Sequence, residues 1–489
     1  MRVMAIKEDL IGIVGAKNVT DDEKKLKQYS KDYSLNRPGM PSYVVQANNA
    51  EQVQNIVKLA NENKLPVVPC SSGVHFDGNT IPVQGGIVLD LRKMNKILDM
   101  DDRNRTVMFE PGVTWGQLQS AVEKQELMAL CPLLPHPLKS ALTSHLEREP
   151  MLIPKFEYTD NLFTMEVVLP DGELFRTGSA CVPGFPDKSL ADGVNPSGPG
   201  MIMYNRLLQG AQGTLGIVTW VLVKTEYRPK VNKTFFIPFD NIEDAVELVY
   251  KVQRHMVGEE CLILNSLNLA SILAKKWPEE FNALRKSLPP WTVVLVLGGG
   301  KRFPEERIEY EEEALNEVAA QLSIMELPTS VPDVPGVGRE LPDMLRSAWP
   351  KERTYWKFAY KGASQDLFFQ TTLNKAHIFS QAINEVAFKH DYPVHDIGYY
   401  VQPIEYGGKC HFECNLYYDP ANNEEMASIK NLYVEAAEVV LDKGGFFSRP
   451  YGVVADMVYS RTTSYTTILK KVKNMLDPNN VMSPGRLCF

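Results

Sequence analysis

The chain has 489 residues, of which 44% are hydrophobic and 23% are charged, and its formal net charge is −8 at pH 7. This length and composition predict a globular protein with more than one domain. The negative charge and the lack of a basic run argue against nucleic acid as a partner. The N-terminal stretch places Lys and Glu before a short apolar run, which fits neither a secretory signal nor a membrane span. We therefore expect a cytoplasmic protein.

The cysteines argue against a disulfide framework, because their number is odd and their spacing is scattered. Cys410 and Cys414 form the one close pair, and the sequence around them lacks further ligands for a zinc or iron–sulfur site. We expect no metal centre. The seven cysteines are at positions 70, 131, 181, 261, 410, 414 and 488.

The first predicted elements form a strand–helix–strand unit. Residues 41–47 (PSYVVQA) predict a short strand, and residues 48–64 have the apolar spacing of a helix, with Asn48 or Asn49 as its N-cap. Residues 65–69 (LPVVP) predict the next strand.

A run of small residues follows at 69–82 (PCSSGVHFDGNTIP). Such a run allows a tight turn, and it also allows the backbone to approach a ligand closely. Taken alone, it is explained by a turn between two strands as well as by a cradle for phosphate.

The following segments continue the pattern of short elements. Thr114 and Gln117 form a capping-box pattern at the start of a helix. Asp171-Gly172 is typical of the turn of a hairpin. The strands predicted in this part lie at 85–91, 105–113, 163–178 (the hairpin) and 213–230.

From about residue 230, helical segments such as 241–256 alternate with short strands such as 291–299 and 411–419. Residues 228–233 (RPKVNK) are a plausible domain boundary. The last predicted helix, over 464–476, stops at Asp477-Pro478.

Five landmarks occur in one order: the loop 69–82, FEPGVTWGQL (109–118), MEVVLPDGELFRTG (165–178), GAQGTLGIVT (210–219) and DPNNVMSPGR (477–486). Together they make the chain resemble the flavoprotein family of vanillyl-alcohol oxidase and para-cresol methylhydroxylase. The resemblance implies an α+β fold in which a substrate-binding α+β cap is inserted into a split FAD-binding domain of the para-cresol-methylhydroxylase type. The limits it implies are 1–228 for the FAD-binding domain, 229–469 for the cap and 470–489 for the return to the FAD-binding domain.

The resemblance also implies which residues hold FAD. The loop residues Ser71 to His75 are expected to meet the pyrophosphate through backbone N–H groups, although Ser71 and Ser72 stand where relatives often carry Gly. We expect Gly73 to need a positive φ or a close approach to the cofactor. The implied FAD-binding residues are Ser71, Ser72, Gly73, Val74, His75, Pro111, Gly112, Gly213, Gly216, Ile217, Val218 and Arg486; Gly112 is equally explained by a turn.

A catalytic carboxylate is implied at Glu157. Vanillyl-alcohol-oxidase-like enzymes carry an Asp near the flavin at a fixed interval after a Glu-Arg pair, and here Glu147-Arg148 places Glu157 at that interval. The alternative is that Glu157 is a solvated loop carboxylate or a partner of Lys155.

A second catalytic candidate is Arg449. Phenol-oxidising relatives carry a Tyr-Arg pair with an Asp seven residues after the Arg; Arg449 and Asp456 keep that spacing, but Ser448 replaces the Tyr. The family's other phenol-binding Tyr falls near Asp77. Both departures count against a phenolate clamp, yet Arg449 can still bind a carboxylate or another anion bidentately. An ion pair of Arg449 with Asp456 or another acid is the alternative.

Covalent attachment of FAD is disfavoured. The attachment His or Tyr of the cap aligns at or beside Asp366, and the attachment His of the loop aligns with Val74, although His75 is an alternative. Non-covalent FAD is therefore expected. His411 lies on an alternating strand that can face the active site, or it can be structural.

The expected function is that of an FAD-dependent oxidoreductase that removes hydride from a small alcohol, hydroxy acid, or benzylic or phenolic substrate. One alternative is the flavoprotein subunit of a D-2-hydroxy-acid dehydrogenase, which the Arg without its Tyr would fit. That family usually has a His-rich metal motif in the cap, and the sequence shows none. The other alternative is a non-catalytic flavin-binding subunit of an electron-transfer complex. We expect a homo-oligomer, and a redox partner protein is a possible electron acceptor.

Overall fold

The computed structural model describes residues 2–153, 155, 161–188 and 192–489. Its first sheet has the strand order β1-β2-β4-β3, in which β2 (Tyr43–Gln46), β4 (Ile87–Asp90) and β3 (Val67–Cys70) are parallel. The short β1 (Val19–Thr20) adds an antiparallel edge. Helix α3 (Ala50–Asn63) connects β2 to β3, and its N-cap is Asn49, whose side chain accepts a hydrogen bond from the N–H of Gln52. The predicted strand–helix–strand unit is confirmed.

The second sheet is antiparallel and has the order β5-β6-β10-β8-β9, with β7 paired to β10. Thr114 and Gln117 form the predicted capping box at the start of α4 (Trp115–Val122). Gly172 has a φ of +83° at the tip of the predicted hairpin. The strands are β5 (Ile97–Asp101), β6 (Thr106–Phe109), β7 (Leu127–Ala129), β8 (Leu162–Val168), β9 (Leu174–Arg176) and β10 (Ile217–Tyr227).

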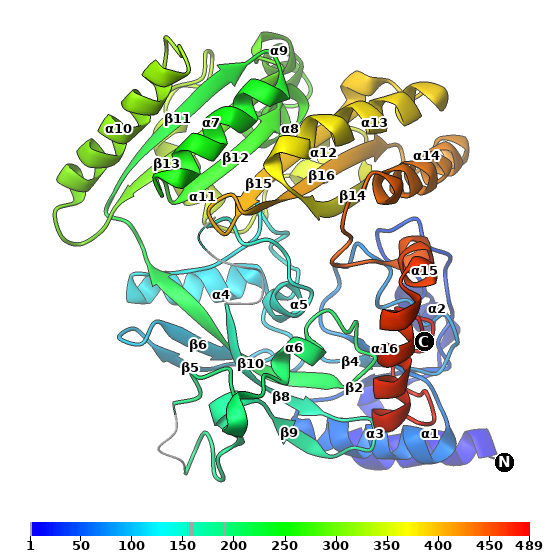
Figure 1. The fold of residues 1–489 in the computed structure, drawn as a ribbon. Coiled ribbons are helices and arrows are strands. Elements are labelled where there is room, and N and C mark those ends of the chain that lie inside the picture. Colours follow the sequence, from blue (N-terminus) through cyan, green and yellow to red (C-terminus); the bar gives the residue numbers. More distant parts are fainter. Residues whose placement is uncertain (1, 154, 156–160, 189–191) are drawn as a thin grey trace.

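The third sheet is antiparallel, with the order β11-β13-β12-β15-β16-β14. Figure 1 shows it in the upper part of the molecule, with the other two sheets below and β10 leading up into β11. Its strands are β11 (Val231–Phe239), β12 (Glu260–Asn265), β13 (Trp291–Gly299), β14 (Ala363–Thr371), β15 (Ile397–Ile404) and β16 (Lys409–Tyr418).

The two faces of the third sheet differ in chemistry. On β16, Cys410, Phe412 and Cys414 point into a hydrophobic core under the helices α7, α10, α13 and α14. The alternate residues His411 and Glu413 point to the other face, which meets the first half of the chain. The helices of the outer face are α7 (Ile242–Arg254), α10 (Pro304–Gln321), α13 (Ala376–Lys389) and α14 (Asn423–Asp442).

On the inner face, a second core covers the part of the sheet near β12 and β13. The helices that contribute to it are α8 (Ser266–Leu273), α9 (Glu279–Ser287), α11 (Val337–Leu345) and α12 (Trp356–Ala359). The polar side chains of the inner face, among them Asp366, His411 and Glu413, lie on its other part, near β14 to β16. The remaining helices are α1 (Arg2–Val14), α2 (Glu23–Leu26), α5 (Ala141–Leu146), α6 (Asn205–Leu208), α15 (Gly452–Arg461) and α16 (Thr463–Leu476).

The end of the chain returns to the first sheet. Helix α16 lies below α15 and runs down towards the lower part of the molecule (Figure 1). The N–H of Val67 on β3 then donates to the carbonyl of Val481 (2.7 Å), and the N–H of Ser483 donates to the carbonyl of Val67 (2.9 Å). The α+β class is confirmed, and the domain limits of 1–228, 229–469 and 470–489 stay a prediction. In the described part of the chain, no helix combines the length and the apolar character that crossing a bilayer requires.

We predict that the buried ammonium of Lys473 is needed for stability. It donates to the carboxylate of Asp477 (2.6 Å) and to the carbonyls of Thr214 (2.8 Å) and Met482 (3.0 Å), so it joins α16, the approach to β10 and the last segment. Removing one partner of a buried ion pair costs about 3–5 kcal/mol. Lys473→Met should therefore lower the free energy of unfolding by about 3 kcal/mol, measured by urea denaturation.

The control for this experiment is Lys470→Met, because Lys470 is exposed on the same helix. Its free energy of unfolding should change by less than about 0.5 kcal/mol. Equal stability of the two variants would contradict the structural role of Lys473.

Candidate active site

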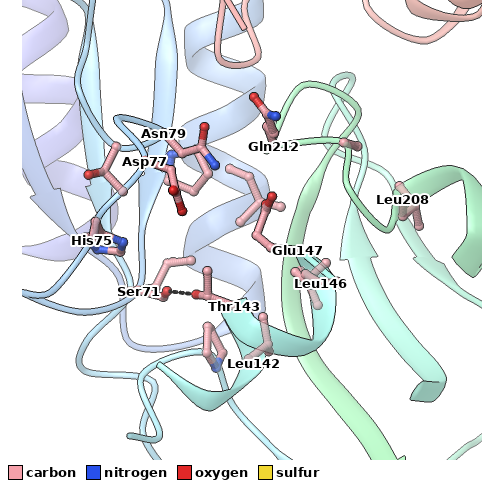
Figure 2. Close-up of a pocket in the computed structure, with 18 of the residues that line it drawn as sticks. Ser71, His75, Asp77, Asn79, Leu142, Thr143, Leu146, Glu147, Leu208 and Gln212 are labelled. Atoms are coloured by element: carbon pink, nitrogen blue, oxygen red, sulfur yellow. Dashed lines mark hydrogen bonds between the residues drawn. The ribbon is translucent and has the colours of Figure 1, made fainter. Parts of the chain in front are cut away.

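A cavity lies where the loop after β3 faces α5 and the start of β10, and we call it the loop cavity (Figure 2). Ser71 Oγ and Thr143 Oγ1 are 2.8 Å apart across it. Ser140 begins α5 as its N-cap by accepting from the N–H of Thr143. Further lining residues are Pro69, Asn79, Leu91, Leu142, Leu146, Glu147, Gln212, Gly213, Ile217 and Val218.

The loop cavity fits a dinucleotide in its chemistry. Its walls combine apolar side chains such as Leu142 and Ile217 with the polar groups of Ser71, Thr143 and Gln212. Flat rings need apolar walls, whereas ribose and phosphate need hydrogen-bonding groups. Gly213 has a φ of +74°, and a Cβ there would lie 2.9 Å from Pro69 and Ser483. Glycine at this position therefore lets β3 and the last segment of the chain pack closely against the backbone of Gly213.

Seven of the predicted FAD-binding residues line this cavity: Ser71, His75, Pro111, Gly213, Gly216, Ile217 and Val218. Ser72 and Gly73 lie at a different hollow on the other side of the loop, next to Tyr29 and Arg92. Val74 is buried. Arg486 contacts the backbone of the loop: its guanidinium donates to the carbonyls of Gly78 (2.6 Å) and Ile81.

The expectation of a positive φ at Gly73 is wrong, since Gly73 is not among the positive-φ glycines and a Cβ there would meet only Arg92, at 3.9 Å. A close approach of Gly73 to the cofactor stays a prediction. At Gly112, a Cβ would lie 2.7 Å from the carbonyl oxygens of Arg92 and Met94. The close packing of this turn against residues 92–94 therefore explains Gly112 by itself.

A second cavity, the cap cavity, lies between the inner face of the third sheet and the first half of the chain. It shares Phe76, Asp77, Lys139 and Glu149 with the loop cavity, so the two cavities adjoin. Its rings come from Phe76, Tyr355, Trp356, Phe368 and Tyr400, and its charged side chains are Asp77, Lys139, Glu149, Lys357, Asp366, Glu413 and Arg449.

The charged groups on the sheet side are paired. Lys357 Nζ lies 2.5 Å from Asp366 Oδ2 and 2.6 Å from Glu413 Oε1. Asn415 Nδ2 donates to Asp366 (2.7 Å) and to Glu413 (2.8 Å). Burial disfavours the charge on Lys357, but the two carboxylates outweigh burial and raise the pKa of Lys357 well above its usual value.

His411 lies behind the lining of the cap cavity. It is 2% exposed, and its Nε2 is 3.1 Å from Glu413 Oε2. Its ring packs near those of Phe368 and Tyr400. Burial lowers the pKa of His411, with Glu413 acting in the opposite direction. His411 lies on the inner face, where it contacts Glu413, and its role in the active site stays a prediction.

Arg449, the second catalytic candidate, lies at the cap cavity. It is 6% exposed, and its guanidinium carbon lies 4.2 Å from the ring centroid of Phe368. Asp456, the acid predicted as its alternative partner, is exposed on α15. The carbonyl of Ser448, which stands in the place of the family's Tyr, accepts a hydrogen bond from Arg148.

The opposite wall of the cap cavity carries a second buried ion pair, between Lys139 and Glu149. Burial alone would raise the pKa of Glu149, but Lys139 and Arg449 outweigh burial and lower it. Nearby, the hydroxyl of Tyr451 donates to Glu147 (2.7 Å), whose pKa burial raises.

Two predicted positions have different outcomes. Asp366, where an attachment residue was expected, lies at the cap cavity and accepts from Ser364 Oγ (2.8 Å) as well as from Lys357. Glu157 lies outside the described residues. Lys155, its alternative partner, lies 3.8 Å from the carboxylate of Glu259.

Five residues of the cap cavity were not predicted from the sequence: Lys139, Glu149, Tyr355, Lys357 and Glu413. The alternation of polar and apolar residues along 409–418 indicates that Glu413 shares a face with His411. The sequence around Tyr355 and Lys357 shows no comparable alternation of polar and apolar residues. In the described ranges, no group of three His, Cys, Asp or Glu residues is placed to hold a metal ion, and all seven cysteines are free thiols.

Comparisons with known proteins agree with this geometry. A family model described as "FAD binding domain" matches residues 41–178, and one described as "FAD linked oxidases, C-terminal domain" matches residues 228–487. The chain is 25% identical over 493 residues to the glycolate oxidase subunit GlcD of Bacillus subtilis (strain 168), covering 99% of this chain and 96% of that protein. It is also 25% identical over 509 residues to the 4-cresol dehydrogenase (hydroxylating) flavoprotein subunit of Pseudomonas putida, covering 97% of this chain and 93% of that protein.

The fold is similar to that of p-cresol methylhydroxylase in a crystal structure with substrate bound. The TM-score is 0.85 at 22% identity, and the match covers 99% of this chain and 96% of that chain. The predictions of this fold, of FAD as the cofactor and of an oxidoreductase are confirmed. The chain belongs to the family of FAD-linked oxidases and is an FAD-linked oxidoreductase, with a fold like that of p-cresol methylhydroxylase.

Proposed function

We propose that the enzyme removes a hydride from a small aromatic molecule, at a benzylic or alcohol carbon, in the cap cavity. Aromatic side chains surround the cap cavity, and this observation supports the proposal most strongly. The cap cavity adjoins the loop cavity through Phe76 and Asp77. When bound, FAD supplies the acceptor for the hydride. Seven of the residues predicted to hold FAD line the loop cavity, from Ser71 to Val218.

The residues of the cap cavity have separate roles in this proposal. Tyr355, Trp356 and Phe368 pack against a flat substrate and exclude water. Arg449 donates hydrogen bonds to an oxygen of the substrate. His411 holds Glu413, and Glu413 in turn helps to fix Lys357. The role of Glu157 as a base stays a prediction that rests on the family resemblance.

A second candidate function is oxidation of a D-2-hydroxy acid. Arg449 favours it, because a buried guanidinium at a cavity can bind a carboxylate bidentately. The relative from Bacillus subtilis is named for glycolate, which is a 2-hydroxy acid. Two relatives are named as subunits, which supports the proposal that a partner protein accepts the electrons.

Anaerobic flavin bleaching by a substrate panel tests the proposed function. We expect 4-alkylphenols or benzylic alcohols to reduce the flavin at least about tenfold faster than D-lactate or glycolate, since a difference of about 1.4 kcal/mol in transition-state binding gives that ratio. The matched control is a benzylic alcohol with two methyl groups on the carbinol carbon, which has no hydride to give and should cause no bleaching. Faster bleaching by the 2-hydroxy acids would favour the second candidate, and no bleaching by aromatic substrates would contradict the first.

We also predict that FAD is bound non-covalently. Asp366 and Val74 stand where attachment residues are expected, and the Asp366 side chain is held by Lys357 and Asn415. Acid precipitation of the holoenzyme should therefore leave the yellow colour in the supernatant. Flavin that stays with the pellet would refute this, and loss of that retention in His75→Ala would then identify the attachment.

A further inference from the structure

Asp77 lies where three cavities meet. Together with Phe76, it lines the loop cavity, the cap cavity and a third cavity at the N-terminal segment and α14. In Figure 2, Asp77 and Asn79 lie opposite Gln212 and Glu147 across the loop cavity. The residues that the third cavity adds include Ser34, Asn36, Gln365, Lys430, Tyr433 and Tyr451.

The backbone around Asp77 is fixed from several sides. Asn36 Nδ2 donates to the carbonyl of Asp77 (3.3 Å), and the N–H of Gly78 donates to Asp32 Oδ2 (2.6 Å). Gly78 has a φ of +83°, and a Cβ there would lie 2.4 Å from Asn36 Nδ2. The tight turn at Gly78 therefore sets where the Asp77 side chain enters the cavities.

Asp77 differs from the other carboxylates of these cavities. Asp366 and Glu413 share Lys357, and Glu149 pairs with Lys139. Among the described residues, none forms a hydrogen bond or an ion pair with the carboxylate of Asp77. A carboxylate without such a pair can accept a proton from a ligand without breaking an existing contact.

We propose that Asp77 is the catalytic base that takes the proton of the substrate hydroxyl while the hydride leaves the adjacent carbon. This inference rests on the proposed function. In the step, the substrate O–H bond breaks and a new O–H bond forms on the Asp77 carboxylate. In an alcohol, the electron pair of the broken bond stays on the oxygen and forms the C=O bond as the hydride leaves the same carbon. In a 4-alkylphenol, this pair forms the C=O bond of a quinone methide, the ring π electrons shift, and the exocyclic C=C bond forms at the benzylic carbon that loses the hydride. The oxidant is the FAD of the established activity.

The electrostatic surroundings suit this role. The titratable groups that face Asp77 are Lys139, Arg449, Glu149, Asp32, Tyr433 and Tyr451. Burial is the largest influence and raises the pKa of Asp77 to about 7, while Lys139 and Arg449 act in the opposite direction. A general base works best when its pKa lies near the working pH.

The test compares flavin reduction in the wild type and in Asp77→Asn, with the best substrate of the panel and matched FAD content. The base works only when ionised, so the wild-type rate should rise with pH through about 7 and then level off. In Asp77→Asn the rate should fall by about a hundredfold or more, and this rise should disappear. Asp99→Asn is the control, because Asp99 is exposed on β5; it should behave as the wild type.

Glu157→Gln serves as the competing variant. If its profile loses the rise near pH 7 while that of Asp77→Asn keeps it, the proposal is overturned and Glu157 is the base. An Asp77→Asn rate within threefold of the wild type would also overturn it.

A measurement without substrate separates this proposal from the proposed function. Infrared difference spectra of the holoenzyme between pH 5 and pH 9 should contain the carbonyl band of a carboxyl group that titrates near 7, and Asp77→Asn should lack that band. If no panel substrate bleaches the wild type, the proposed function fails while this spectrum still reports on Asp77. A spectrum that is identical in the two proteins would overturn the assignment of Asp77.

Discussion

The pairing of Lys357 with Asp366 and Glu413 is the constraint on which the cap side of the site depends. These three charges lie on the inner face of the third sheet, where burial makes an unpaired charge costly. Because the carboxylates come from two adjacent strands, β14 and β16, the lysine links the side chains of both strands. The aromatic side chains around these charges, from Tyr355 to Tyr400, enclose the cap cavity, and the paired charges form its fixed polar end.

The site is completed by segments that are distant in the sequence. The loop after β3 brings Phe76 and Asp77, the segments flanking α5 bring Lys139 and Glu149, and the stretch before α15 brings Arg449. Arg486 near the end of the chain holds the loop through the carbonyls of Gly78 and Ile81. The geometry of the site therefore depends on the return of the chain to the first sheet. The buried Lys473 stabilises this return through its hydrogen bonds to the carbonyls of Thr214 and Met482.

Much of the lower part of the molecule could be predicted from local sequence signals. Asn49 and Thr114 are N-caps with clear partners, and Asp171-Gly172 supplies the glycine with a positive φ at the hairpin turn. The cavity residues from Ser71 to Val218 followed from ordered family landmarks. In contrast, Tyr355, Lys357 and Glu149 are brought together by contacts between segments up to about two hundred residues apart, for which a single sequence has no local signal. At Gly73 the small-residue run left two explanations open, a positive φ or a close approach to the cofactor, and its backbone excludes the positive φ.

We propose that the substrate binds in the cap cavity, between the aromatic wall and the junction at Asp77 and Arg449. A crystal structure of the FAD-loaded enzyme with the unreactive dimethyl benzylic alcohol tests this most directly. We expect the aromatic ring of the ligand between Tyr355 and Phe368, with its hydroxyl within about 3 Å of Asp77, the range of a hydrogen bond. Ligand density confined to the third cavity beside Ser34 and Lys430, with an empty cap cavity, would contradict it.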